Sequence, residues 1–296
     1  MALKGKSINL FLMDGTATGR VKCTLANWNG VAYRIPRTEI DKCKDRPDLK
    51  SSGVYFLFGV SDETGIGVVY IGQACSRKNG EGVLYRLLEH KRSVSKDYWS
   101  EAIVFTSSNN WLGPTEISFL ENRFYNLAKT AGRYEVKNGN DPTIGNVTEE
   151  KESELEEFVE NAKVIMGVLG HQVFNHLTKS PEQGKEEKNQ DYSNSEKFIY
   201  KGKKAEGSGI RTSDGFVVLK GSVLNPSVAK SCPKNTIKNR ERYASAVDEN
   251  NRLIDNILFP SPSAAASFLS GTSVSGMSAW KLGEKTLHDL EIQEST

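Results

Sequence analysis

The sequence predicts an α+β protein with more than one domain. Two short runs of β-branched and aromatic residues, 54–58 and 68–71, flank a stretch with turn chemistry at 61–65, and this arrangement is typical of an antiparallel hairpin. Two stretches with a helical hydrophobic period follow, at 82–94 and 115–129. At 296 residues the chain exceeds one typical domain, and its composition is ordinary for a soluble globular protein.

The first fifty residues are expected to form a small β element that packs onto the domain after it. Turn pairs separate three β-prone runs, which predict strands at 7–13, 20–26 and 31–35, with turns at Asp14-Gly15 and Asn29-Gly30.

The predicted hairpin carries two tyrosines. Because side chains alternate across a strand, Tyr55 shares a face with Leu57, and Tyr70 shares one with Val68. A suitable register puts both phenols side by side on one face, whereas a register shifted by one residue would remove one of them. Gly72 would let the chain turn tightly or let a phosphate approach the backbone.

The first helix, 82–94, is expected to bury one stripe and to present two basic side chains opposite it. The apolar stripe comprises Val83, Leu84, Leu87 and Leu88. Arg86 and His90 are four residues apart and are therefore neighbours on the helix surface. An arginine fork matches two phosphate oxygens and keeps its charge.

The second helix, 115–129, supplies a candidate metal ligand. Its inward residues are Ile117, Leu120, Phe124 and Leu127, and Glu121 lies beside them. Magnesium takes only one or two protein carboxylates and keeps several waters, so one glutamate suffices. Glu116 competes for this role but lies on a rather different face. Residues 133–138 then predict a short strand or edge that ends in Asn138, which offers donors and an acceptor.

These residues together resemble the GIY-YIG endonuclease superfamily over about 53–142. The series begins with Gly53-Val54-Tyr55, where valine replaces the usual isoleucine, and continues with Tyr70-Ile71-Gly72. The interval 56–69 between the tyrosines is longer than is usual in the family, and we interpret 62–67 as a lengthened hairpin tip, which costs little closure entropy. The resemblance implies a small three-stranded antiparallel sheet flanked by helices, and a site made of Tyr55, Tyr70, Arg86, His90, Glu121 and Asn138.

The activity that the resemblance implies is metal-dependent hydrolysis of DNA phosphodiester bonds. One tyrosine, Tyr55 or Tyr70, would orient or deprotonate the attacking water, while Glu121 holds Mg²⁺ or Mn²⁺ and Arg86 neutralises phosphoryl charge. An ordinary tyrosine pKa is about 10, so nearby cations such as Lys78 would have to lower it. His90 would accept the tyrosine proton or contact the phosphate, and the sequence leaves both roles open.

Each of these residues also has an ordinary structural explanation. Tyrosines in strands are mostly packing residues. Taken alone, Arg86 and His90 would be surface helix residues, and Asn138 would be a turn former. Only their ordered combination favours a catalytic site.

Several function classes are disfavoured by the whole chain. No run of eighteen apolar residues exists and the first residues lack a signal-peptide core, so a cytoplasmic protein is expected. The four cysteines show no paired spacing, which argues against a zinc site and a disulfide framework.

Charge is distributed unevenly although the net charge is only +2. Residues 149–160 contain seven glutamates, which suit the start of a helix predicted over 155–169. Residues 198–245 contain ten basic and three acidic residues, which indicates contact with a phosphate backbone or else a solvated charged face. The candidate nucleic-acid contacts are Lys78, Arg211, Lys220, Lys234, Lys238 and Arg240.

The sequence therefore predicts three domains and one linker. A nuclease domain with its trailing helix occupies 51–177, after the β element 1–50, and a polar linker covers 178–197. The remaining residues, 198–296, form an α+β module with a hairpin around Asp214-Gly215 and a helix that Ser261 caps, beginning at Pro262 and ending at Gly271. This module resembles the small RAMA-type modules that follow some GIY-YIG domains, and the resemblance implies DNA binding that could respond to base modification.

Two other functions remain open at the level of sequence. The chain could retain the nuclease fold and act as a DNA-binding or regulatory protein, or it could cut RNA or branched or damaged DNA. Cleavage of both strands would require a dimer or rebinding, because one site cuts one strand.

Overall fold

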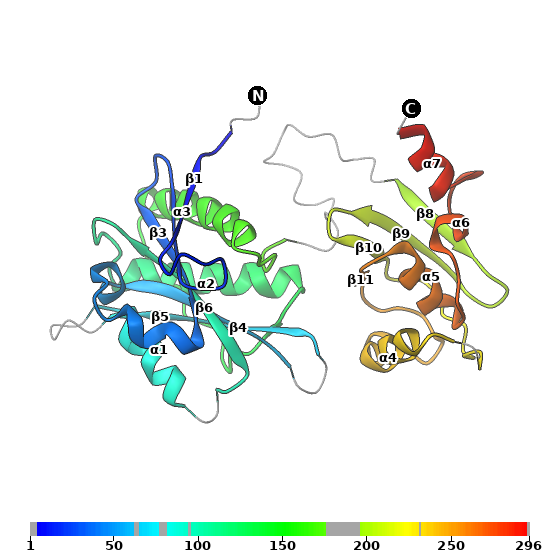
Figure 1. Ribbon diagram of the computed structural model, residues 1–296, viewed down its shortest axis with the longest axis horizontal. Coiled ribbons are helices and arrows are strands. Elements are labelled where there is room, and N and C mark those ends of the chain that lie inside the picture. Colours follow the sequence, from blue (N-terminus) through cyan, green and yellow to red (C-terminus); the bar gives the residue numbers. More distant parts are fainter. Residues whose placement is uncertain are drawn as a thin grey trace. The chain divides into compact units, whose positions relative to one another are not determined.

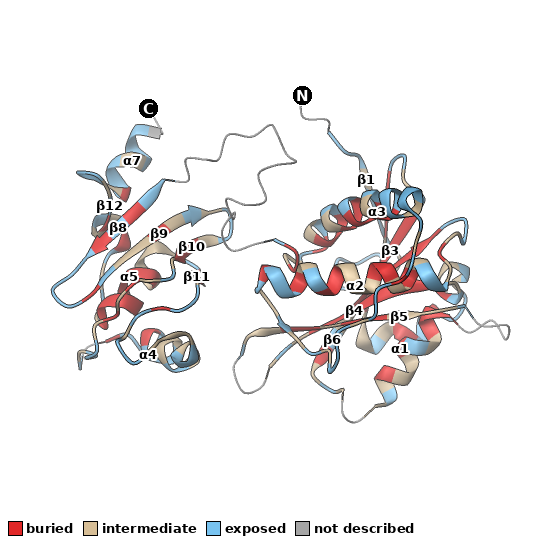
Figure 2. Ribbon diagram, turned by 180° about the vertical axis from the view of Figure 1, so that it is seen from behind, coloured by how far each residue is buried: buried red, intermediate tan, exposed pale blue. Residues whose placement is uncertain are grey.

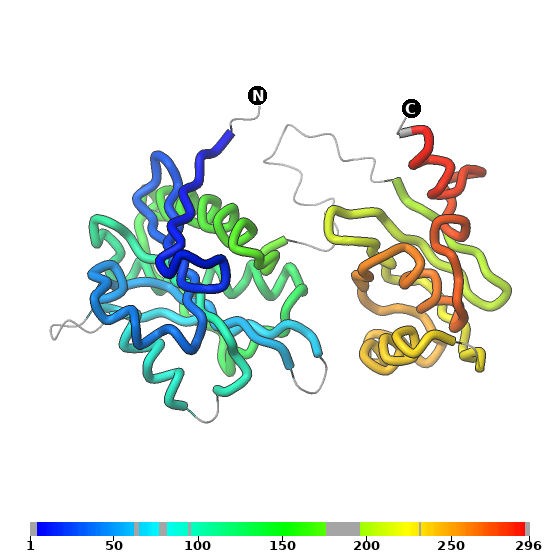
Figure 3. Tube along the Cα trace, in the orientation of Figure 1, coloured from blue at the N-terminus to red at the C-terminus, as the bar shows by residue number. Residues whose placement is uncertain are grey.

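The computed structural model describes residues 5–61, 65–76, 82–93, 96–175, 196–230 and 232–294. The chain divides into two compact units, Met1–His176 and Leu177–Thr296, which are traced in Figure 3. Of the predicted linker, 178–197, only residues 196 and 197 are described. Lys78 also lies outside the described residues. Within the described ranges, no helix is both long and apolar enough to cross a membrane.

Unit 1 is built on one seven-stranded mixed sheet (Figure 1). Its strands occur in the spatial order β1-β2-β3-β6-β4-β5-β7, and every pair is antiparallel except β5 with β7. Their bounds are β1 Ile8–Leu12, β2 Val21–Leu25, β3 Gly30–Pro36, β4 Gly53–Val60, β5 Gly67–Ala74, β6 Trp99–Ser107 and β7 Glu135–Val136.

The expected three-stranded sheet was therefore wrong in extent. The N-terminal strands do not form a separate layer, because β3 pairs with β6 along seven residues and so continues the same sheet. Strand β6 was not predicted at all, yet it lies between β3 and β4 at the centre of the sheet. Its pairing partners are remote in sequence, so no local turn signal marks it.

Helices cover both faces of this sheet (Figures 1 and 2). Helices α2 (Pro114–Ala131) and α3 (Glu149–Val168) lie on one face, over an aromatic core that includes Phe56 and Phe124. Helix α1 (Val83–Arg92) and two short 3-10 helices, Arg37–Cys43 and Pro47–Lys50, lie on the other. Both layers exclude water from the central strands.

Strand β4 explains how one segment serves both layers. Val54, Phe56 and Phe58 join the core under α2, while Tyr55 and Leu57 point into the layer of α1. The strand is therefore an almost continuous apolar run, as expected of a strand that is buried on both faces. Its alternation delivers Tyr55 to the side of α1.

Local signals account for the helix ends. Helix α2 begins with Pro114 and is capped by Glu116, whose carboxylate accepts a 3.0 Å hydrogen bond from the Gly113 amide. It ends at Gly132, whose φ of 64° is the left-handed conformation that suits glycine. Helix α3 begins at Glu149 after Thr148, earlier than predicted, with acidic residues in its first turn where the helix dipole favours them.

Unit 2 contains a six-stranded antiparallel sheet in the order β11-β10-β9-β8-β12-β13. The strands are β8 Lys197–Lys201, β9 Glu206–Thr212, β10 Gly215–Val218, β11 Ile257–Phe259, β12 Trp280–Leu282 and β13 Lys285–Thr286. The helices are α4 Lys234–Arg242, α5 Pro262–Ser270, α6 Gly276–Ala279 and α7 Leu287–Glu294.

The predicted hairpin and helix of unit 2 are both confirmed. Strands β9 and β10 pair around residues 213–214. Ser261 caps α5 by accepting from the Ala264 amide at 3.2 Å, and Gly271 ends the helix with a φ of 71°. The core behind α5 is aromatic, with Phe216 and Trp280 rings 4.5 Å apart between centroids.

Candidate active site

Strand pairing brings the two tyrosines to one face of the sheet. Tyr55 on β4 pairs with Gly72 on β5, and Leu57 pairs with Tyr70, so the phenols occupy diagonal positions. Their ring centroids are 6.3 Å apart. This is the register that keeps both tyrosines together, as the sequence favoured.

Gly72 leaves room for the Tyr55 ring and does not form a turn. It lies inside β5, and a Cβ at this position would come within 2.4 Å of the Tyr55 hydroxyl and 2.5 Å of its Cζ. Any side chain at Gly72 would therefore push the phenol away. The expected turn at this residue was wrong, because Gly72 lies inside β5 against the Tyr55 ring.

His90 is the hydrogen-bond partner of Tyr55. Its Nε2 lies 2.7 Å from the Tyr55 hydroxyl, and its ring also packs against Tyr70. The prediction that His90 lies opposite the apolar stripe was wrong, because the side chain is only 4% exposed and lies with Val83 and Leu87 on the buried side of α1. The positions 83, 87 and 90 follow the helical period of a single stripe.

Burial shifts the pKa values of Tyr55 and His90 in opposite directions. Desolvation raises the pKa of Tyr55 well above its ordinary value, with a smaller contribution from Tyr70, while Arg86 acts against the shift. Burial lowers the pKa of His90 to about 4, helped by the charges of Lys96 and Arg86. At neutral pH the pair is therefore a phenol and a neutral imidazole, which is able to accept a proton.

Arg86 stands at the exposed edge of the same helix face. Its Nη1 lies 2.5 Å from the Glu89 carboxylate, and this pairing is the main reason that its pKa is raised. The Arg86 side chain is 45% exposed, and its guanidinium also interacts with the Tyr55 hydroxyl. It can thus exchange Glu89 for another anion without leaving the site.

Lys96 is a site residue that sequence reasoning missed. Its ammonium lies 3.5 Å from the centroid of the Tyr70 ring, a cation–π contact. Burial, and secondarily repulsion from Arg86, lowers the pKa of Lys96 to about 8. No sequence pattern marks this lysine, since it follows α1 in a polar segment, so only the fold reveals its position.

Glu121 reaches the site from α2. Burial raises its pKa, and hydrogen bonds from the side chain and backbone of Gln73 partly offset that rise. Gln73 follows Gly72 on β5, so the carboxylate is held next to the tyrosine strand. The competing Glu116 is used to cap α2, which leaves Glu121 as the carboxylate of this helix that faces the site.

Asn138 is placed beside the site in a structural role. Its side chain accepts from the Ile71 amide at 3.1 Å and donates to the Ile71 carbonyl at 2.8 Å. Both ends of the amide are thereby engaged with the backbone of β5 between Tyr70 and Gly72. Asn138 therefore fixes the strand that carries the tyrosine.

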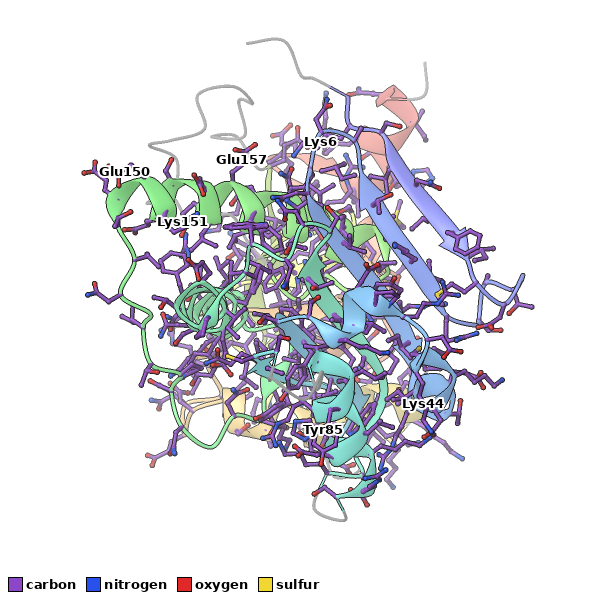
Figure 4. All side chains as sticks on the ribbon, turned by 90° about the vertical axis from the view of Figure 1, so that its left-hand side faces the viewer. Lys6, Lys44, Tyr85, Glu150, Lys151 and Glu157 are labelled. Carbon is purple, nitrogen blue, oxygen red and sulfur yellow. The ribbon has the colours of Figure 1, made fainter. Side chains whose placement is uncertain are left out.

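A cavity of about 550 Å³ opens next to these residues. It is lined by Gln73, Ala74, Cys75, Gly82, Tyr85, Arg86, Glu89, Pro114 and Ser118; Tyr85 is labelled on α1 in Figure 4. Arg86 and Gln73 connect the cavity to the buried phenol and to Glu121. The site thus has an open side with a guanidinium and a closed side with the Tyr55–His90 pair.

Candidate residues from α1 and α2 converge on Tyr55 of β4. Its hydroxyl bonds His90 and interacts with Arg86, and the charge of Glu121 acts on it as well. Among the described residues no cluster of three or more His, Cys, Asp or Glu side chains could hold a metal. The carboxylate of Glu121 is the kind of oxygen ligand that magnesium takes, together with water and substrate oxygens.

The basic residues predicted in unit 2 have different fates. Arg240 is a structural residue, because its guanidinium donates at 2.7–2.9 Å to the carbonyls of Asn225, Phe268 and Leu269. The Nη1 atom of Arg211 lies 3.7 Å from Oε1 of Glu291, so these side chains form an ion pair. Arg211, Lys220, Lys234 and Lys238 are exposed, and the last two lie one turn apart on α4.

One family model matches the chain. It is described as a domain of unknown function, DUF4357, and covers residues 198–291, which lie within unit 2. No curated protein and no solved structure matches the chain.

Proposed function

We propose that unit 1 is a metal-dependent endonuclease of the GIY-YIG type that hydrolyses phosphodiester bonds of DNA. The proposal depends on one observation, the environment of the Tyr55 hydroxyl. This hydroxyl lies 2.7 Å from Nε2 of His90, whose pKa is lowered, and it also interacts with Arg86. A phenol from β4, an imidazole and a guanidinium from α1 and the Glu121 carboxylate from α2 are the groups that this hydrolysis needs. The strands β6, β4 and β5 would be the three-stranded core of that fold.

Tyr55 is the tyrosine that we assign to proton transfer. The water that attacks phosphorus gives its proton to the Tyr55 oxygen, while the Tyr55 proton passes to Nε2 of His90. The phenol stays neutral throughout, so the raised pKa of Tyr55 is no obstacle to the step. Because Tyr55 is 1% exposed, bulk water does not compete with this transfer. The half-buried Tyr70 would orient the water from the other side.

Two cations would bind the phosphate. Arg86 would exchange Glu89 for two phosphate oxygens, since a planar fork binds carboxylate and phosphate in the same way. Lys96 would add a second positive charge beside Tyr70. These charges oppose the negative charge that builds on the phosphoryl oxygens in the transition state.

Glu121 would hold Mg²⁺ or Mn²⁺. When bound, such a cation stabilises the charge on the leaving oxygen. The hydrogen bonds from Gln73 orient the carboxylate for this role.

Unit 2 would hold the nucleic acid while unit 1 cuts it. Lys234 and Lys238 give α4 an exposed basic stripe that suits a phosphate backbone. Arg240 is not part of that surface.

Nicking of supercoiled plasmid in the presence of magnesium tests the proposal. We expect Glu121→Ala, Tyr55→Phe and His90→Gln each to lower the rate by at least about 100-fold, and Glu157→Ala, an exposed glutamate of α3, to leave it unchanged. Because Tyr55 and His90 act as one relay, the double variant should lose little more than either single variant. Cleavage that ignores all three changes would refute the site.

A second candidate is a nucleic-acid-binding protein that does not cut. It is favoured by the burial of Tyr55, which is 1% exposed and so leaves little access for an attacking water. Binding of the plasmid without nicking in magnesium or manganese would support this alternative. Competition with RNA and branched DNA in the same assay identifies the preferred substrate.

A further inference from the structure

Strand β1 forms an open edge of the seven-stranded sheet. The sheet ends at β1 on one side and at the two-residue strand β7 on the other. Four of the five residues of β1 are exposed, and three of them are large and apolar: Leu10 is 44%, Phe11 55% and Leu12 40% exposed. An exposed, apolar edge strand is a template for pairing with another strand.

The hydrogen-bonding direction of β1 identifies which backbone groups face outward. The Met13 amide donates to the Arg20 carbonyl, and the Ala26 amide donates to the Ser7 carbonyl, so odd-numbered residues are directed at β2. Since the direction alternates along a strand, Ile8, Leu10 and Leu12 direct their amides and carbonyls away from the sheet.

We propose that two copies of this chain pair through their β1 strands, antiparallel and about a twofold axis at Leu10. In this register Leu10 lies opposite Leu10 of the second copy, and Ile8 lies opposite Leu12, so the full strand and all three outward-facing residues are matched. Ile8–Leu12 contains no charged residue, so no like charges meet within the ladder.

The flanking charges favour the same occupant and the same register. Lys6 and Asp14 lie four residues before and after Leu10. Antiparallel pairing centred on Leu10 would bring the Lys6 end of each strand near the turn that contains Asp14 of the other copy. Within their own chain, Lys6 donates to Asn161 and Asp14 binds Arg20. Figure 4 shows the labelled Lys6 at the N-terminal strands that form the margin of the sheet. Pairing shifted by one residue either way loses this match of opposite charges.

A second copy also accounts for the apolar side chains on both sides of the strand. On one face, Leu10 would pack against Leu10 of the other copy and Leu12 against its Ile8, while on the opposite face Phe11 would lie across from Asn9 of the other copy. An interface made of one five-residue strand from each copy is smaller than the interfaces of most stable complexes, and small interfaces are typical of weak association. We therefore expect a dimer that dissociates on dilution.

Sedimentation equilibrium between about 1 and 200 µM tests this inference with the whole chain. We expect the mass to rise from 32.7 kDa toward twice that value with increasing concentration. Leu10→Lys, which sets two ammonium groups face to face at the axis, should lower the association constant at least about tenfold. Val60→Lys, at a residue that is 58% exposed, is the matched control and should leave association unchanged.

A cross-linking experiment tests the register without relying on that variant. Two Leu10→Cys chains would have their Cα atoms about 5.5 Å apart, so a short bis-maleimide should join them in high yield. Val60→Cys sets the level for random collision, and the wild-type chain sets the background from the half-buried Cys75. A monomer at every concentration, or a dimer that neither Leu10 change affects, would overturn the inference. Either result leaves the proposed cleavage activity untouched, because mass and cross-linking do not depend on it.

Discussion

Replacing Gly72 by alanine tests whether the position of the Tyr55 phenol governs both packing and activity. The new Cβ would lie 2.4 Å from the Tyr55 hydroxyl and 2.5 Å from Cζ. Ordinary contact requires about 3.5 Å, so the ring must move by about 1 Å. The 2.7 Å bond to His90 cannot survive such a displacement unchanged, because His90 is itself buried.

The expected magnitudes follow from this displacement. Overpacking a buried site costs about 1–3 kcal/mol of unfolding free energy, and a misplacement of about 1 Å at a catalytic group costs about 100-fold in rate. Urea denaturation measures the first quantity and plasmid nicking the second. Gly139→Ala is the matched control, since a Cβ there meets nothing within 4 Å.

A double variant identifies the cause of the loss. Gly72→Ala combined with Tyr55→Phe removes the hydroxyl that makes the closest contact, so part of the stability should return while the activity stays low. If Gly72→Ala alone kept wild-type stability and nicking rate, the reasoning about this close approach would be refuted.

Three further outcomes follow from the charges. Below pH 6.5 the unfolded chain binds a proton at His90 that the folded chain, with a pKa of about 4 there, does not bind; unfolding free energy should therefore rise by up to about 3 kcal/mol from pH 4 to 6.5. Urea titrations of His90→Gln should lack this part of the slope, and an identical slope would contradict it. Glu89→Gln should release Arg86 and tighten binding of an uncleaved oligonucleotide in calcium by up to about fivefold, since both side chains are partly exposed; unchanged fluorescence anisotropy would argue against that competition. Arg240→Met should lower the unfolding free energy of unit 2 by about 2–4 kcal/mol, with Lys238→Met neutral, whereas a loss of DNA affinity without destabilisation would restore a phosphate-binding role to Arg240.

The elements that the sequence predicted are those with local signals. The hairpin of β4 and β5, helix α2 and helix α5 each combine a hydrophobic period with turn or capping residues, and all three are present. No turn or capping residues mark strand β6. Its position is set by pairing with β3 and β4, which are distant in the sequence. Pairing between strands that are distant in the sequence therefore cannot be predicted from local patterns.

The same distinction applies to the site. The register of Tyr55 and Tyr70 follows from alternation along two strands, so it was predictable. The contact of the Lys96 ammonium with the Tyr70 ring joins residues that are distant in the sequence, so only the folded chain reveals it. Asn138 shows the converse limit, because an amide with donors and acceptors fits catalysis and strand support equally well until its partners are known.

The burial that positions the Tyr55–His90 pair would also couple its chemistry to substrate binding. In the free protein, desolvation and the charges of Lys96 and Arg86 hold the pKa of His90 at about 4, so the imidazole is a weak base. A phosphodiester bound to the two cations would offset their repulsion of a protonated imidazole and so raise the proton affinity of His90. The relay would gain its driving force only when the scissile phosphate is present. On the proposed function, binding of the substrate would therefore make His90 a stronger base than it is in the free protein.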